Sequence, residues 1–211
     1  MTDEKRPITV EDLYQIAAVE DPCISPDGRW IAYVHMTIDR LENGYKHTIW
    51  LAPTDGGPPV QVTRGGKDSQ PRWRPDGNML AFTSARNEKP QVYLLPVGSP
   101  GGEARALTDM PNGASNPVWS PDGAQIAFLA RMSADERARE DSSEEEPPPS
   151  NLFEAKQNKE RKEHEEQERW DPRFLWRIPY RVGIKFLDDR YAQIYVIPAT
   201  EELPAEARQP R

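Results

Sequence analysis

Ser25-Pro26-Asp27-Gly28 is the stretch that decides the fold of this chain, because it returns twice. The second copy is Arg74-Pro75-Asp76-Gly77 and the third is Ser120-Pro121-Asp122-Gly123. Before each copy stand a polar residue, a proline, a variable residue and a large apolar residue, and after it an apolar run that contains alanine. The copies lie 46 and 49 residues apart, a spacing that is typical of propellers and other repeat arrays.

Each copy predicts a tight turn between two strands. The proline sets φ at the first central position, the aspartate bonds to downstream backbone, and the glycine takes a positive φ that side chains resist. Such turns predict hairpins. Arg74 stands where the other copies have Ser25 and Ser120, so the sequence argues against a nucleophilic role for these serines.

Two further apolar strands follow the hairpin in the first two copies. The predicted strands of the first copy are Pro22–Ser25, Trp30–His35, Thr48–Ala52 and Val60–Thr63. Four short antiparallel strands in each unit of about 45 residues predict a β-propeller blade. We therefore expect an all-β chain, a partial propeller of about three blades, divided into a lead-in over 1–20, a first blade over 21–64, a second over 65–110 and a third over 111–211.

The lead-in predicts a short helix. Thr9 is a candidate N-cap before an acidic first turn, and apolar residues recur with helical spacing as far as Ala17. We expect this helix to pack across the first repeat without any chemical role.

The third repeat contains a charged insert over residues 131–189. Residues 131–169 hold 13 acidic and 8 basic residues, and residues 158–169 predict a solvated helix with ion pairs such as Lys159 with Glu163 and Lys162 with Glu166. The aromatic-rich residues 170–180 predict a packed arm, with contact to a substrate or partner as the alternative.

Glu144-Glu145-Glu146, followed by three prolines, can be interpreted in two ways. The carboxylates could bind the free amine of a peptide substrate, or the segment could be a solvated linker.

The third blade is expected to stop before it is complete. Its third strand is predicted at Gln193–Ile197, and Glu206-Ala207-Arg208 resembles Glu103-Ala104-Arg105 before the outer strand of the second blade. The Leu-Thr pair that ends that strand, Leu107-Thr108, has no counterpart before Arg211. Three blades are also fewer than the four to eight that close a propeller, so we expect an open array that associates through its exposed sheets.

Composition narrows the partners and the compartment. The net charge of −8 makes nucleic acid and anionic membranes poor partners. Cys23 is the one cysteine, which excludes an internal disulfide and is expected to be a small buried residue. No apolar run approaches the roughly 20 residues that cross a bilayer and no signal-peptide core is visible, so we expect a soluble, cytoplasmic chain without membrane contact.

A catalytic or cofactor site is not predicted. The Gly-x-Ser-x-Gly elbow of serine hydrolases is absent, and its nearest approach, Gly113-Ala114-Ser115-Asn116-Pro117, is expected in a loop between blades. The three histidines, His35, His47 and His164, do not have metal-ligand spacing, so no metal is expected. No glycine-rich loop precedes a helix, and we expect no nucleotide or other cofactor.

The three frames resemble the TolB-like propeller repeat. Thr9-Val10-Glu11-Asp12-Leu13 and residues 181–190, Arg-Val-Gly-Ile-Lys-Phe-Leu-Asp-Asp-Arg, are similar to acylaminoacyl-peptidase and dipeptidyl-peptidase-like members of the prolyl oligopeptidase family of serine peptidases. This resemblance implies an amino-terminal propeller, commonly seven-bladed, that limits the access of peptides to an α/β-hydrolase domain with a Ser, Asp, His triad. No position of this chain matches the triad, so no catalytic residue is assigned.

Three hypotheses remain open from the sequence. In the first, the chain is the beginning of a gating propeller, and its partners are the remaining blades, the hydrolase domain and short peptides. In the second, it is a TolB-like propeller that serves as a protein-interaction module. In the third, the acidic insert is a regulatory segment.

Overall fold

The computed structural model of this chain is built almost entirely of strands. It describes residues 7–98, 102–133, 136–137, 156–160, 181–182, 185–186 and 190–199. The chain divides into two units, one formed by Met1–Arg131 with Ala192–Arg211 and the other by Met132–Tyr191.

The first unit contains three antiparallel sheets, which we call the first, second and third blades. The first blade has the order β1(Ala17–Ile24), β2(Trp30–Asp39), β3(Gly44–Pro53), β4(Val60–Gln61). The second has the order β5(Asp68–Trp73), β6(Met79–Ser84), β7(Gln91–Pro96), β8(Arg105–Ala106). The third has the order β13(Tyr191–Pro198), β10(Gln125–Met132), β9(Ala114–Trp119). The predicted all-β class and the meander of four strands are therefore confirmed in the first two copies.

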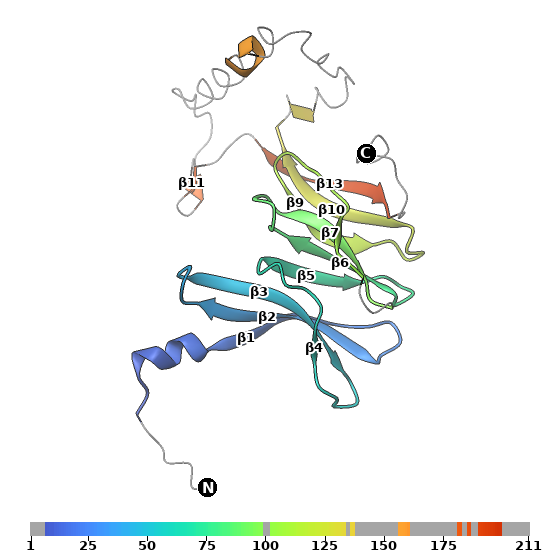
Figure 1. Cartoon of the computed structure of the whole chain (residues 1–211). Helices are drawn as coiled ribbons and strands as arrows, with labels where there is room; N and C mark the ends of the chain where they lie inside the picture. Colours follow the sequence, from blue (N-terminus) through green and yellow to red (C-terminus); the bar gives the residue numbers. More distant parts are fainter. Residues whose placement is uncertain are drawn as a thin grey trace. The chain divides into compact units, whose positions relative to one another are not determined.

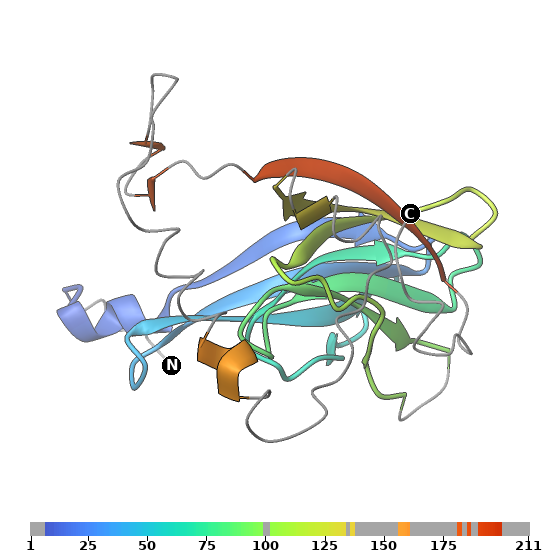
Figure 2. The ribbon, with the colours of Figure 1, turned by 90° about the horizontal axis from the view of Figure 1, so that it is seen from above.

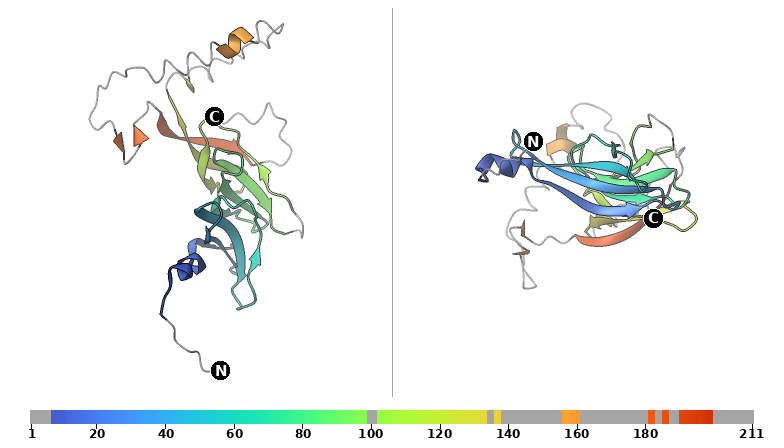
Figure 3. Two further views of the ribbon diagram at one scale, coloured as in Figure 1. Left: turned by 60° about the vertical axis from the view of Figure 1, so that its left-hand side comes forward. Right: turned by 90° about the horizontal axis from the view of Figure 1, so that it is seen from below.

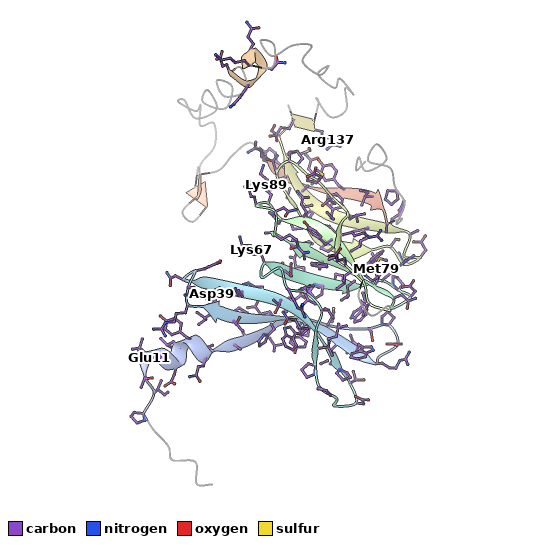
Figure 4. All side chains as sticks on the ribbon, in the orientation of Figure 1. Glu11, Asp39, Lys67, Met79, Lys89 and Arg137 are labelled. Carbon is purple, nitrogen blue, oxygen red and sulfur yellow. The ribbon has the colours of Figure 1, made fainter. Side chains whose placement is uncertain are left out.

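The sheets follow one another in chain order. In Figure 1 they run from β1–β3 in blue through β5–β7 in green to β9 and β10, with β13 in red beside β10. Figure 2 and Figure 3 show the same succession of layers from above and from two further directions. Figure 4 shows that Asp39, Lys67 and Lys89 lie at one end of the sheets and Met79, which follows the second repeated turn, at the other.

The first three strands of the first blade are longer than the sequence predicted, whereas the outer strand β4 ends at Gln61 instead of Thr63. β1 begins at Ala17 instead of Pro22, and β2 continues past His35 to Asp39. The additional residues pair with each other, with Ala17 opposite Thr37. An unbroken register with β3 also supports the extended part of β2. The residues before Pro22 therefore join the sheet, because β2 and β3 form a long hairpin that offers them a free edge.

The predicted amino-terminal helix is a single 3₁₀ segment, η1(Val10–Gln15). The backbone N–H of Thr9 donates to the Asp12 carboxylate at 2.7 Å, as in a capping box. The segment contacts the first repeat, with the Arg40 guanidinium 4.9 Å from the centre of the Tyr14 ring, but it buries none of its residues, and Val10 is 70% exposed. Six residues are too few to form an apolar face two turns long, and Ile16 is already extended.

The second unit is described only in short segments. β11(Arg181–Val182) and β12(Lys185–Phe186) form an antiparallel pair, and residues 156–160 are helical. Ser133 and Glu136 form a capping box, with Glu136 N–H donating to Ser133 Oγ at 3.1 Å and Ser133 N–H to the Glu136 carboxylate at 2.9 Å. The same carboxylate binds the Arg190 guanidinium at 2.6 Å, so residues far apart in the sequence meet here.

Two predictions about this unit lie outside the described residues. The ion pairs of Lys159 with Glu163 and of Lys162 with Glu166 include residues that the structure does not describe, as does the aromatic segment 170–180. The described helical residues do contain one pair of the same i,i+4 spacing, Lys156 with Glu160 at 3.8 Å, and its exposure makes it worth little stability.

Candidate functional site

The three repeated turns share one backbone geometry. In the first turn the N–H of Gly28 donates to the carbonyl of Ser25 at 2.9 Å, and Gly28 has a φ of 72°. Gly77 and Gly123 make the same bond, also at 2.9 Å, with φ of 76° and 70°. A positive φ at this position is the reason for glycine in every copy.

The aspartate of each turn bonds to its own loop. Asp27 accepts hydrogen bonds from the Ser25 hydroxyl at 2.6 Å and from the Arg29 N–H at 3.1 Å. The bond from Ser25, together with those from Arg29, lowers the pKa of Asp27 to about 2. The oxygen of Ser25 in turn accepts the Trp30 N–H at 2.9 Å, and the residue is buried. The Ser25 hydroxyl thus donates one hydrogen bond and accepts another, and both bonds stabilise the turn.

Successive turns lie against one another. A side-chain carbon added to Gly77 would lie 3.8 Å from Cδ of Pro26, and one added to Gly123 would lie 3.0 Å from Nε of Arg74. The Arg74 guanidinium also lies 5.7 Å from the centre of the Trp119 ring. The turns therefore form a stack that crosses from blade to blade.

A tryptophan indole joins each blade to the one before it. Trp73 Nε1 donates to the carbonyl of Cys23 at 3.1 Å, and Trp119 Nε1 donates to the carbonyl of Arg72 at 3.0 Å. Cys23 and Arg72 occupy the same position of the repeat, as do the two tryptophans. The large apolar residue of the frame thus sets the register between neighbouring sheets.

The polar residue before each repeat proline has a left-handed backbone. Asp21, Gln70 and Asn116 have φ of 45°, 55° and 55°, and a bulge interrupts the first hairpin pairing beside this position. The residue before a proline normally prefers an extended conformation, so the surrounding contacts must impose this backbone.

These same polar residues connect the blades through their side chains. Asp21 pairs with Arg72 of the second blade at 2.9 Å. Gln70 accepts the backbone N–H of Asn116 at 2.9 Å and donates to its side-chain oxygen. The innermost strands β1, β5 and β9 are thus linked by a row of paired polar groups.

The wide faces of neighbouring blades pack as apolar layers. We call the face toward the preceding blade the leading face and the face toward the following blade the trailing face. One buried cluster contains the trailing face of the first blade and the leading face of the second, formed by Ala32, Val34, Ile49, Leu51 and by Leu80, Phe82, Tyr93, Leu95. The leading face of the third blade has equivalent residues that are at most 5% exposed, Ile126, Phe128, Tyr195 and Ile197. Burial of these layers is the main source of cohesion between the blades.

In the first two blades, a threonine side chain makes a hydrogen bond to the neighbouring strand just beyond the end of the short outer strand. β4 and β8 are only two residues long. Thr63 Oγ1 accepts the N–H of Ile49 and Thr108 Oγ1 accepts the N–H of Val92, both at 2.9 Å. This bond is the structural role of the apolar-Thr pair that ends the outer strand in both blades.

The other candidate residues of the sequence do not form a reactive site among the described residues. The His35 ring contacts the Trp50 ring edge-to-face, and Nε2 of His47 lies 3.8 Å from the Glu20 carboxylate. Ser115, expected in a loop, lies in β9 opposite Leu129. The described residues contain no group of histidine, cysteine or carboxylate side chains that could hold a metal ion.

Cys23 lies at the junction of the first two blades. Its Sγ donates to the carbonyl of Pro71 at 3.1 Å. Burial raises the pKa of the Cys23 thiol to about 11, and the nearby Arg72 guanidinium only partly offsets this. The thiol is therefore protonated at neutral pH, although Cys23 is half-buried where the sequence predicted a buried residue.

Two further predictions cannot be placed. Glu144, Glu145 and Glu146, proposed to contact a substrate amine, and His164 lie outside the described residues. Among the helices that the structure describes, none is long and apolar enough to cross a membrane.

These features define a propeller built from repeated four-stranded blades, and comparison with known proteins gives its family. The sequence profile of the TolB beta propeller domain matches residues 16–146, and the chain belongs to this family.

Several relatives of this chain are peptidases of greater length, and a TolB homologue of Chlorobium chlorochromatii is 38% identical over 52% of this chain and 23% of its own. The uncharacterized peptidase YuxL of Bacillus subtilis is 40% identical over 149 residues, which are 68% of this chain and 22% of the relative. Dipeptidyl-peptidase 5 of Porphyromonas endodontalis is 26% identical over 66% of this chain and 20% of its own. The acylaminoacyl peptidase of Pyrococcus horikoshii has the same fold, with a TM-score of 0.59 at 17% identity over 88% of this chain and 24% of its own. The matched part thus spans about a fifth to a quarter of each relative.

Proposed function

We propose that this chain is the first part of the gating propeller of a serine peptidase of the acylaminoacyl or dipeptidyl type, and that it has no catalytic activity by itself. The observation that carries the proposal is the 40% identity to a peptidase over 68% of this chain, in a segment that makes up 22% of that relative. The active groups would then lie in an α/β-hydrolase domain that this sequence does not contain.

The geometry of the blades supports a role in access control. Asp21 is paired with Arg72, and Gln70 is paired with Asn116, along the innermost strands. Polar groups that already bond to each other offer few free donors or acceptors to a passing peptide. If β1, β5 and β9 line the centre of a closed ring in the whole protein, a passage with such walls would select by width and admit short peptides but not folded proteins.

We propose that the working protein is cytoplasmic. Its thiol, Cys23, is held protonated at a blade junction and needs no oxidising compartment. Cell fractionation with an antibody against the chain tests this proposal, and recovery in an exported fraction would contradict it.

The proposed function is tested with the chain extended along its own coding sequence. We expect further blades and a domain with a Gly-x-Ser-x-Gly elbow, and cleavage of acylated aminoacyl or dipeptidyl chromogenic substrates that is lost when the elbow serine is replaced by alanine. The 211-residue chain is the matched control and should be inactive.

Gating needs a second measurement on the active protein. Cleavage of a labelled short peptide is compared with cleavage of a folded protein that carries the same sequence in a loop. Phe82→Ala, which removes a side chain from the interface between the first two blades, should increase cleavage of the folded substrate relative to the peptide. An unchanged ratio, with the variant folded, would argue against gating.

The second candidate is a propeller that serves only as an interaction module. It is favoured by the family match, which covers the propeller repeat and no catalytic motif. A coding sequence that continues with blades but without a hydrolase domain would support it over the peptidase.

A further inference from the structure

The same bulge interrupts the innermost strand of every blade. β1, β5 and β9 are edge strands, each bonded to one neighbour in its own sheet. In each of them a polar residue with a left-handed backbone and the proline after it stand where the partner strand has one aromatic residue. These pairs are Asp21-Pro22, Gln70-Pro71 and Asn116-Pro117. A bulge of this kind breaks the regular row of backbone groups that an edge strand otherwise offers to an added strand.

In the third blade, the backbone N–H groups on the outward side of the edge are all engaged or missing between Ala114 and Pro117, within the part of the chain that the structure describes. The N–H of Ala114 donates to the carbonyl of Pro90 at 2.7 Å. The N–H of Asn116 donates to Oε1 of Gln70 at 2.9 Å. The residue between them points toward β10, and a proline has no N–H to donate. An added strand would therefore find no donor on this stretch of β9.

The second blade closes its edge through the carbonyl at the bulge. Pro71 has no N–H, and its ring is fully buried. Its carbonyl accepts Nη1 of Arg72 at 2.7 Å and Sγ of Cys23 at 3.1 Å. At the start of the same edge, Lys67 forms a β-bridge with His47 of the first blade. The bulge of β5 thus offers neither a donor nor a free carbonyl at its proline.

The left-handed residue is what makes this arrangement possible in spite of its local cost. A residue before a proline prefers an extended backbone, which would restore a regular edge. Asn116 is exposed, so its N–H would be open to an added strand without the side chain of Gln70. The amide of Gln70 reaches it from the preceding blade, and this contact needs the left-handed backbone of both residues to bring the two bulges side by side.

We propose that the bulge of the innermost strands prevents an extended polypeptide from adding to the blades as a further strand. Extended peptides bind free sheet edges through backbone hydrogen bonds, with little dependence on sequence. A segment that meets these edges finds the bonding groups missing or already bonded, so it is not held. This inference goes beyond the proposed function, because it concerns any extended polypeptide and applies with or without a hydrolase domain.

Restoring the donors of β9 tests the proposal. Gln70→Ala frees the N–H of Asn116, and Pro117→Ala supplies the missing N–H; the two changes are combined in one variant. The matched control combines Gln125→Ala with Pro58→Ala, which removes the same two residue types from the central strand β10 and from an exposed loop.

The probe is a fluorescein-labelled peptide of alternating threonine and valine with a lysine at each end. A second peptide of the same sequence has every other residue N-methylated and cannot pair along that edge. Binding of both peptides is measured by fluorescence anisotropy, and circular dichroism checks that each variant is folded.

We expect the native chain and the control to bind both peptides equally weakly. The double variant should bind the unmodified peptide at least about tenfold more tightly than the native chain does, because it gains two backbone hydrogen bonds. Gln70→Ala alone should show a smaller gain, and the N-methylated peptide should show none.

Three results would overturn the proposal. The first is a native chain that binds the unmodified peptide as tightly as the double variant does. The second is a folded double variant with no gain over the control. The third is an equal gain for the N-methylated peptide, which would show that strand pairing is not involved. If the double variant does not fold, the comparison of Gln70→Ala with Gln125→Ala decides by the same criteria. A coding sequence without a hydrolase domain would contradict the proposed function and leave this test unaffected.

Discussion

Replacing Trp119 by phenylalanine tests whether the indole links hold the blades together. The variant loses the 3.0 Å bond from Nε1 to the Arg72 carbonyl, a net loss of about 1 kcal/mol. It also weakens the contact with the Arg74 guanidinium, 5.7 Å from the ring centre, by about 0.5 kcal/mol. We therefore expect a loss of about 1.5 kcal/mol in the free energy of unfolding, about a tenfold change in the equilibrium constant.

Urea titration followed by far-UV circular dichroism measures this loss without depending on the fluorophore that is removed. The dependence of the free energy on urea should keep its slope, because the same surface is exposed on unfolding. Trp73→Phe should cost a similar amount, since its indole makes the equivalent bond to Cys23. Trp30→Phe is the control at an accessible position, 36% exposed, with an expected change within about 0.5 kcal/mol.

One result would refute the reasoning. If Trp119→Phe and Trp73→Phe lose no more stability than Trp30→Phe, the indole bonds contribute nothing measurable and the blades are held by apolar packing alone.

Three other properties follow from described groups. The pKa of Asp27 falls from 3.8 to about 2 on folding. The stability that its carboxylate contributes is therefore complete above pH 3.8 and is lost as the pH falls toward 2. The urea midpoint of unfolding should drop between these pH values, and it should drop less in Asp27→Asn. Cys23, with a thiol pKa of about 11, should react slowly with iodoacetamide at pH 8 and rapidly in urea, and equal rates would exclude its burial. Gly28→Ala meets no atom within 4 Å and should cost about 1–2 kcal/mol from its positive φ alone. Gly123→Ala should cost more, because its new carbon would lie 3.0 Å from Arg74 Nε. Equal losses in urea titrations would mean that the Arg74 side chain moves aside without cost.

The repeated turns made the order of the strands predictable from sequence. A proline, an aspartate and a glycine act within a few residues, so the hairpin at Gly28 needs no information from distant parts of the chain. The hydrophobic positions of β6 and β7 followed from their apolar runs for the same reason. Local sequence preferences therefore predicted the order of the strands within a single blade.

Contacts between blades could not be predicted in this way. The left-handed backbone of Gln70 contradicts the local preference before a proline and depends on bonds to Asn116, 46 residues away in the sequence. The helix expected over residues 9–17 lost its last residue, Ala17, to β1 for a similar reason, because an edge of β2 was available for pairing. Tertiary pairing overrode local propensity in both cases.

The connection of each blade only to its neighbours has a consequence for the dynamics of the chain. The leading face of the second blade packs on the first blade, and the third blade follows it, so every residue of β6 is buried. In a linear array of this kind the end units open first and the middle unit last. Backbone amides of β6 should thus exchange with solvent most slowly, and those of β1 and β13 should exchange through fraying of the ends, which makes the second blade the folding unit on which the other two depend.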